Sequence, residues 1–162
     1  MGALSIREAV PADAELMLDY IRELAEFERL SAECVTDAAM LRRYLFEDKR
    51  AHALMAEWNG APAGFALYFY NFSTFLGRPG LYLEDLFVRS AFRRNGIARG
   101  LFQALARKAV AEGCGRFEWS VLDWNENAIR FYRGLGAVPL DEWTGQRLTG
   151  EALHRLAAET QP

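Results

Sequence analysis

An arginine-rich stretch, VRSAFRRNGIARGLF (residues 88–102), combines positive charge with two glycines. It lies where an apolar strand is expected to give way to a helix that begins near Gly96. The first turn of a helix has unpaired N–H groups and the positive end of the helix dipole, and glycine lets a ligand approach the backbone. Arg93, Arg94 and Arg99 add permanent charge with a geometry that suits phosphate oxygens. The stretch therefore predicts an anion site suited to phosphate, and on these residues alone a solvated turn without a ligand is the open alternative.

The order of predicted elements places this stretch inside an α/β domain. Apolar residues recur at three- and four-residue steps after Asp13, which predicts a helix that Asp13 caps, and Thr36 is expected to open the next helix. Asn59 and Gly60 between two apolar runs predict a hairpin turn. Expected strands cover residues 4–9, the two runs that flank this turn, 80–88, 116–122, 137–140 and 145–148, and expected helices cover 11–30, 36–46, 96–113, 125–136 and 149–159. This order predicts one domain over residues 1–162 with a mixed sheet.

Composition narrows the class of function. The chain has 162 residues, of which 51% are hydrophobic, and a formal net charge of -3. This acidic balance argues against a general nucleic-acid binder. The two cysteines and two histidines are not spaced as metal ligands, so no metal is expected and the cysteines are expected to be reduced thiols. Since the N-terminus lacks a secretory signal and no run of about 18 apolar residues occurs, we expect a cytoplasmic protein that does not contact a membrane.

Two motifs and their context resemble the GNAT superfamily of N-acetyltransferases. RRNGIA (residues 93–98) matches the pattern [Q/R]-x-x-G-x-[G/A], and in DWNENAIRFYRGLGA (residues 123–137) an asparagine opens a helix that carries a tyrosine seven residues later. Four further segments are similar to the diamine and polyamine acetyltransferase branch: ELAEFE, LYLEDLFV, WNENAIRFY and RLTGEALHRLA. Arg94 departs from the glycine usual there, and Ala98 and Arg99 replace a Gly-Ser pair. The resemblance implies a mostly antiparallel mixed sheet, flanked by helices, whose two central strands splay apart.

The same resemblance implies how acetyl-CoA is bound. The main chain of Leu86, Phe87 and Val88 is expected to pair with the pantetheine arm like an added strand. The turn is expected to hold the pyrophosphate through Arg93, Arg94, Asn95, Gly96, Ile97, Ala98 and Arg99. Asn125 is expected to bind the cofactor, to cap its own helix, or both.

Two side chains are expected to carry the proton transfers. Tyr132 is the expected acid, because a phenol with a pKa of about 10 can protonate a departing thiolate; its alternative is a place in the core face of its helix. Glu84 is the expected base, because a carboxylate inside an apolar strand is costly without a task or partner. A structural pair of salt-bridged acids is the alternative for Glu84 and Asp85. In a regular strand Asp85 points to the opposite face, whereas a bulge relaxes that rule.

An acidic lining is expected around the acceptor. Phe27, Glu28, Glu84 and Asp85 are the expected substrate-binding residues. The resemblance, together with this acidic lining, implies acetyl transfer from acetyl-CoA to a primary amine of a small cationic substrate, such as a polyamine, a diamine or a thialysine-like compound. Attack is expected to be direct, in a ternary complex, because no Cys–His pair offers an acyl-enzyme route.

Three other possibilities stay open on the sequence. The first is acetylation of a protein or peptide amine, and the second is an acyl-CoA-binding module without catalysis. The third, a nucleic-acid binder that uses the arginine turn, is disfavoured by the acidic balance. The resemblance also implies a homodimer, with exchange of C-terminal strands near residues 143–148.

Overall fold

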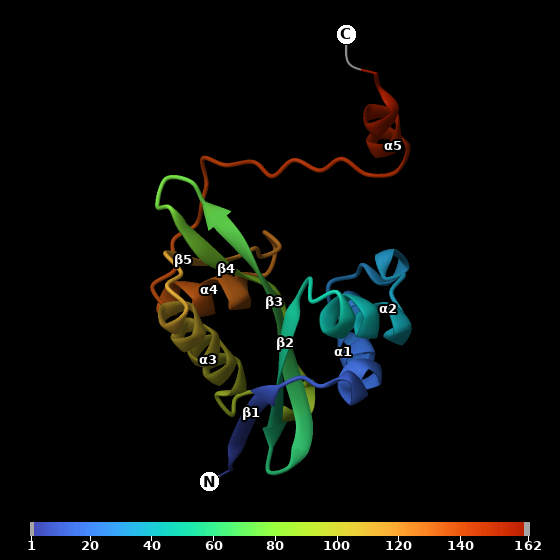
Figure 1. Cartoon of the computed structure of the whole chain (residues 1–162). Helices are drawn as coiled ribbons and strands as arrows, with labels where there is room; N and C mark the ends of the chain where they lie inside the picture. Colours follow the sequence, from blue (N-terminus) through green and yellow to red (C-terminus); the bar gives the residue numbers. More distant parts are fainter. Residues whose placement is uncertain (1, 161–162) are drawn as a thin grey trace. The chain divides into compact units, whose positions relative to one another are not determined.

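A computed structural model describes residues 2–160 of the chain (Figure 1). The chain divides into two compact units, and the boundary falls between Ser120 and Val121. The expected single domain over residues 1–162 stays a prediction. No helix among the described residues is both long and apolar enough to cross a membrane.

The first unit is built on a five-stranded sheet in the order β1-β2-β3-β4-β5. All neighbours are antiparallel except β4 and β5, which are parallel. The strands are β1 (Leu4–Glu8), β2 (His52–Trp58), β3 (Ala61–Ser73), β4 (Arg78–Val88) and β5 (Arg116–Trp119). The mixed, mostly antiparallel sheet is therefore confirmed.

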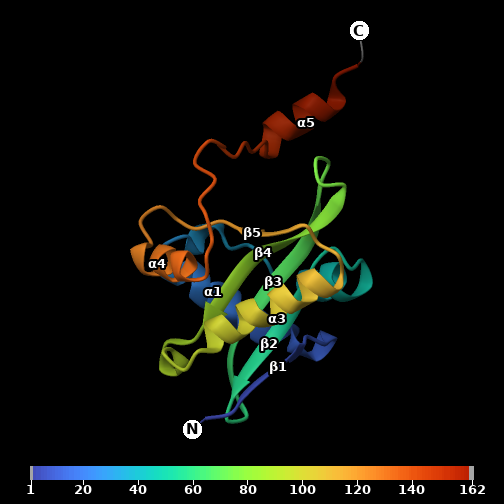
Figure 2. The same cartoon turned by 90° about the vertical axis from the view of Figure 1, so that its left-hand side faces the viewer.

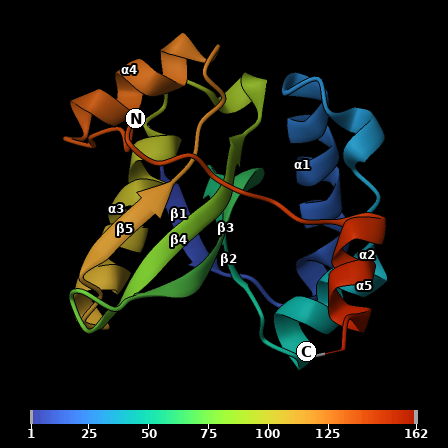
Figure 3. The same ribbon diagram turned by 90° about the horizontal axis from the view of Figure 1, so that it is seen from above.

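Helices cover both faces of this sheet, as Figures 2 and 3 show. α1 (Ala14–Phe27) and α2 (Ala38–Arg42), which a π-helical segment continues over Arg43–Glu47, lie on one face. α3 (Ile97–Ala111) lies on the other face. The central strands, β4 included, are thus enclosed between two helical layers.

Two apolar layers fix the sheet between its helices. Under α1, Met17 and Tyr20 pack with Phe65 and Phe87 of the sheet, and the rings of Tyr20 and Phe65 stack with centroids 5.4 Å apart. On the other face, α3 buries three side chains almost completely: Ile97, Leu101 and Leu105. Since burial of each such side chain stabilises the fold by roughly 1.5–3 kcal/mol, both faces of β4 are firmly packed.

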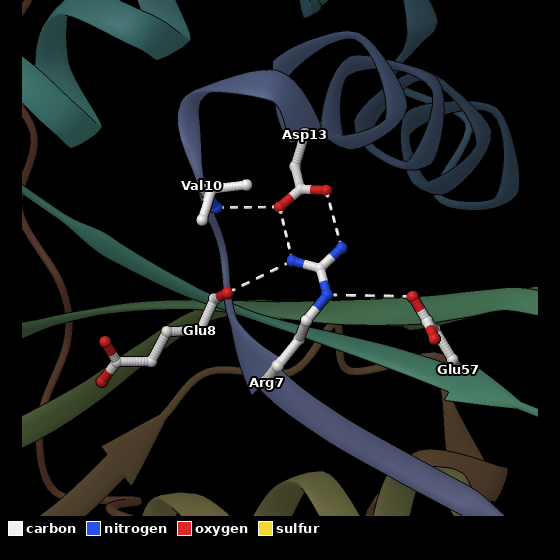
Figure 4. Close-up of polar contacts among 5 residues, drawn as sticks. All are labelled: Arg7, Glu8, Val10, Asp13 and Glu57. Carbon is white, nitrogen blue, oxygen red and sulfur yellow. Dashed lines mark hydrogen bonds and ion pairs between the residues drawn. The ribbon is translucent and has the colours of Figure 1, made fainter. Parts of the chain in front are cut away.

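An ion pair, in place of a side-chain cap, holds the start of α1. The Asp13 carboxylate accepts hydrogen bonds from both terminal nitrogens of Arg7, at 2.7 and 2.9 Å, and from the Val10 N–H at 2.8 Å (Figure 4). The Arg7 guanidinium holds the pKa of the buried Asp13 carboxyl below its ordinary value. Asp13 is the N-cap residue of α1, as expected, but its side chain accepts no N–H of that helix, because Arg7 of β1 offers this carboxylate two charge-assisted donors.

Two other local predictions have different outcomes. The side chain that caps α2 belongs to Asp37, whose Oδ1 accepts the Met40 N–H at 2.7 Å, so the expected cap Thr36 is off by one residue. Asn59 and Gly60 form the predicted hairpin turn, with φ of 52° and 78°. Both angles lie in the left-handed region that a tight hairpin turn requires.

The second unit contains α4 (Glu126–Gly134) and α5 (Gly150–Ala158). Both helices are predicted from the sequence, but the strands expected at residues 137–140 and 145–148 are absent from the described chain. A strand needs a neighbour that pairs with its backbone, and the described part of the second unit contains no strand. Pro139 also removes one of the backbone donors.

Candidate functional site

β4 contains a bulge at Glu84. Asp85 pairs with Leu67 of β3 and Leu83 pairs with Tyr68, so Glu84 is an extra residue without a partner in the register. Directly paired residues share a face of the sheet, and the consecutive residues Leu67 and Tyr68 lie on opposite faces. Asp85 therefore lies on the same face as Leu67. In a regular strand it would have shared the face of Leu83, two residues earlier. The expectation that Asp85 points away from the face of Glu84 applies only to a regular strand, and the bulge removes it.

The face to which Asp85 moves is covered by α1. Leu67 packs against the apolar core beneath this helix, and Glu28 is the residue that ends it. Burial raises the pKa of Asp85 from 3.8 to about 6, and the negative charges of Glu84 and Glu28 contribute to the same rise. Burial also raises the pKa of Glu28. The structure thus groups three of the predicted substrate-binding acids, and we call Glu28, Glu84 and Asp85 the acidic cluster.

Within the acidic cluster the two strand residues differ in exposure. Glu84 is exposed, whereas Asp85 is partly buried and strongly shifted in pKa. The sequence shows two adjacent acids in an apolar strand, but it does not reveal which of them the protein buries. That difference comes from the bulge.

The second edge of β4 opens after Leu83. Figure 3 shows β5 beside β4. The two strands pair only from Gly80 to Leu83 of β4, and the parallel ladder ends at Trp119 of β5. In the described chain, residues 85–88 pair with β3 alone, and the bulge residue Glu84 pairs with neither neighbour. Near the opening, the hydroxyl groups of Tyr82 and Ser120 are hydrogen-bonded at 2.8 Å. The end of this ladder leaves the main chain of residues 86–88 with a free edge in the described sheet, as the predicted splay requires. The splay was expected between two central strands, whereas β5 is the edge strand of the described sheet.

The loop between β4 and α3 has an unusual backbone. Arg94 has φ of 66° and Gly96 has φ of 75°, and α3 begins at the next residue, Ile97. A positive φ costs a non-glycine residue about 1–2 kcal/mol, so Arg94 is strained in a way that Gly96 is not. The side-chain amide of Asn95 donates to the Phe92 carbonyl at 3.0 Å and closes the turn. The predicted order of strand, glycine turn and helix N-terminus is present.

The arginines around this loop have different surroundings. Arg89 bonds Glu23 of α1 through its terminal nitrogen at 2.9 Å and its Nε at 3.1 Å, and its guanidinium carbon lies 4.7 Å from the Tyr20 ring centroid. Arg89 therefore holds β4 to α1 and is no solvated strand end. Arg94 and Arg99 are exposed on the loop and on the first turn of α3.

Arg93 also turns toward α1. Its Nε donates to the Val88 carbonyl at 3.2 Å, and its guanidinium carbon lies 5.5 Å from the Phe27 ring centroid. It lines an open groove of about 280 Å³ together with Glu23, Glu26, Phe27, Phe87 and Ser90. Arg93, a predicted cofactor-binding residue, thus lies beside Phe27, a predicted substrate-binding residue. Ile97, another predicted cofactor residue, has its side chain buried in the core, which leaves only its main chain for a ligand.

The two remaining predicted residues lie in the second unit. The Asn125 side chain accepts the Ala128 N–H at 3.3 Å and so caps α4, which is one of the two functions expected for it. Tyr132 is partly buried on α4, and its ring lies beside that of Phe131 with centroids 5.8 Å apart. The grouping of Tyr132 and Asn125 with the residues of the first unit stays a prediction.

Gly64 of β3 is a residue that sequence reasoning missed. It pairs with Val88, and a Cβ atom at this position would overlap the carbonyl oxygen of Phe87. The missing side chain therefore lets β3 approach β4 closely behind the free edge. A glycine inside an apolar strand pattern is the signal that indicates such an approach.

Comparison with known proteins agrees with this geometry. Residues 16–137 match the model of the acetyltransferase (GNAT) family. The chain belongs to the GNAT acetyltransferase family. It is 40% identical over 162 residues to a thialysine N-epsilon-acetyltransferase of Caenorhabditis elegans, which covers 98% of this chain and 100% of that protein. It is 49% identical over 94 residues to an L-ornithine N5-acetyltransferase of Arabidopsis thaliana, which covers 58% of this chain and 41% of that protein.

A solved structure shows the same fold. The chain matches an integron cassette protein from the mobile metagenome of V. cholerae with a TM-score of 0.80 and 25% identity, over 96% of this chain and 98% of that one. As a member of its family, the protein is an enzyme that transfers an acetyl group from the co-substrate acetyl-CoA to an amine. The free edge of β4 and the turn before α3 suit the extended arm and the pyrophosphate of that molecule.

Proposed function

We propose that this GNAT enzyme acetylates the terminal primary amine of a small cationic acceptor, by direct attack within a ternary complex. The observation that carries the proposal is the acidic cluster beside the free edge of β4. Carboxylates in a partly buried site attract a cation, because the field between opposite charges is less screened there than in water. The relatives that act on thialysine and on ornithine favour an amino acid with a terminal amine, and a polyamine or diamine is the alternative acceptor.

Acetyl-CoA would lie across the opening between β4 and β5. The pantetheine arm would pair with the main chain of residues 86–88 as an added strand, which the free edge supports. The pyrophosphate would rest on the N–H groups that open α3, with Arg94 and Arg99 adding charge. Asn125 is the remaining residue proposed to bind the cofactor.

The proton transfers would divide between the acidic cluster and Tyr132. The acceptor ammonium would lose one proton to a carboxylate of Glu84 or Asp85. Its nitrogen would then attack the thioester carbon, and the C–S bond would break as the C–N bond forms. The thiolate would take the proton of the Tyr132 hydroxyl, and the second amine proton would restore that hydroxyl through solvent. The net products are an N-acetylated amine, coenzyme A and one proton.

The quaternary structure and the cellular setting also belong to this proposal. A homodimer would cover the apolar side chains of the extended segment before α5, among them Trp143, which is 80% exposed. Exchange of residues 143–148 between two chains would supply the strand neighbour that this segment lacks within the described second unit. A cytoplasmic location, without a nucleic-acid or membrane partner, stays the sequence prediction.

Two measurements test the proposed function. Calorimetry should show that the purified protein binds acetyl-CoA, and thiol release should report turnover with thialysine, ornithine, putrescine, spermidine and a lysine-bearing peptide. We expect turnover with the small amines and none with the peptide. Binding without turnover on any amine would identify a non-catalytic module, and turnover on the peptide alone would identify a protein acetyltransferase.

Tyr132→Phe tests the proposed acid. Loss of the phenol proton donor should lower kcat roughly 100-fold or more, while the helical circular dichroism and the Kd for acetyl-CoA remain near those of the wild type. An unchanged kcat would remove Tyr132 from the mechanism.

A further inference from the structure

We infer that Asp85, and not Glu84, takes the proton from the acceptor's ammonium group, while Glu84 and Glu28 hold that ammonium beside it. This inference rests on the proposed acetylation of a small amine. It assigns separate tasks to two adjacent carboxylates that the sequence presents as a pair. The reason lies in the geometry of the bulge and in the unequal burial that follows from it.

The bulge determines which carboxylate is enclosed. The extra residue, Glu84, has no partner on β3, and its side chain is exposed. Asp85 re-enters the ladder opposite Leu67, on the face that packs against α1. Because a regular strand would have placed Asp85 on the Leu83 face, the bulge brings this carboxylate under the end of α1.

The position of Asp85 also suits the opening of the sheet. Asp85 belongs to residues 84–88, the part of β4 that has no β5 neighbour in the described chain. The next residues along the strand, 86–88, are those proposed to bind the pantetheine arm. The carboxyl group therefore lies within a few positions of the proposed path of the acetyl donor.

The charges that face Asp85 favour proton uptake. The charged groups that act on it are Glu84 on its own strand and Glu28 at the end of α1, and both are negative. Its neighbour on β3, Leu67, is apolar. With a pKa of about 6, Asp85 is ionised at neutral pH and still accepts a proton more readily than an ordinary carboxylate. Exposed Glu84 has the simpler task of attracting the cation.

The proton balance of this step is closed. One N–H bond of the ammonium breaks, and one O–H bond forms on Asp85, so the amine nitrogen gains the lone pair that attacks the thioester. After coenzyme A leaves, Asp85 releases this proton to solvent. It is the one net proton of the overall reaction.

A matched pair of variants tests the assignment. Asp85→Asn and Glu84→Gln each remove one negative charge from neighbouring positions with little change in shape. We measure kcat and KM for thialysine and ornithine between pH 5 and 9 at saturating acetyl-CoA. For Asp85→Asn we expect kcat to fall roughly 100-fold or more, with loss of the acid limb near pH 6.

Glu84→Gln should behave differently. We expect kcat within about fivefold of the wild type, a KM for the amine several-fold higher, and an acid limb shifted to lower pH, because one of the charges that raises the pKa of Asp85 is gone. Glu28→Gln should shift the limb in the same direction. A large loss of kcat in Glu84→Gln together with near-normal kcat in Asp85→Asn would overturn the inference.

A direct titration makes the test independent of the acceptor. The carboxyl ¹³C resonance that disappears in Asp85→Asn should titrate in the wild type with a midpoint near 6. A midpoint at an ordinary value of about 4 would overturn the inference even in an active enzyme. If the wild type acetylates none of the amines tested, the proposed function fails, and the titration still decides whether Asp85 is the tuned carboxyl.

Discussion

Asp85→Asn should stabilise the fold at neutral pH while it impairs catalysis. The folded protein raises the pKa of Asp85 from 3.8 to about 6. A shift of about two units corresponds to roughly 3 kcal/mol, at about 1.4 kcal/mol per unit. That is the upper value of the free energy that the ionised carboxylate costs the folded state when the pH lies above both pKa values.

The sign follows from proton binding. Between pH 3.8 and about 6 the folded protein holds a proton on Asp85 that the unfolded chain has already released. The free energy of unfolding of the wild type therefore falls as the pH rises through this window, and the loss is complete above it. The side-chain amide that replaces the carboxyl group in Asp85→Asn cannot titrate, so the variant should lack this part of the pH dependence.

Urea unfolding of both proteins between pH 4 and 7.5 measures the difference. The stability of Asp85→Asn relative to the wild type should rise by roughly 2–3 kcal/mol across that range. Glu84→Gln is the control: it removes only the part of the Asp85 shift that comes from the charge of Glu84, while burial, the largest cause, remains, so the change should be smaller. A difference that stays constant within about 0.5 kcal/mol from pH 4 to 7.5, below which extrapolation error dominates, would show that Asp85 is an ordinary carboxyl and refute the reasoning.

Three further predictions, two of them with a matched second variant, concern the β3–β4 pair and the turn into α3. Arg94→Gly should relieve the positive φ and raise the free energy of unfolding by about 0.5–1 kcal/mol, while loss of its charge weakens acetyl-CoA binding; a fall in stability on urea unfolding would contradict this. Gly64→Ala should cost roughly 1–3 kcal/mol by forcing β3 away from the Phe87 carbonyl, whereas Gly134→Ala, where a Cβ meets no atom within 4 Å, should cost nothing in the same assay. Arg89→Ala should lower Tm through the lost contacts with Glu23 and Tyr20 and leave the Kd for acetyl-CoA unchanged. Arg99→Ala should raise that Kd and leave Tm unchanged. Equal effects of the two variants on Kd would show that the two arginines do not have separate functions.

The sequence by itself determined the elements and the family. Periodicity located α1, α3 and α4 and every strand of the first unit, because each has a local apolar pattern that matches its own geometry. The pattern at residues 93–98 indicated a phosphate site, because a helix N-terminus with glycine and arginine is a local anion site, and the resemblance of its motifs to the GNAT superfamily named acetyl-CoA as the ligand. The Asp13 side chain bonds Arg7 of β1 and not its own helix, and the strands expected at residues 137–140 and 145–148 are absent from the described chain. In both cases the outcome depends on a partner outside the element itself.

Only the tertiary structure decided how neighbouring residues of one type divide their tasks. Arg89 is half-buried against α1, and Arg93 also contacts α1 although it is exposed like Arg94 and Arg99. These contacts depend on how α1 packs on the sheet. Likewise, Glu84 and Asp85 are chemically similar in the sequence. Their difference arises because β4 pairs with β3 one residue out of register, and a pairing register belongs to two strands together and to neither alone.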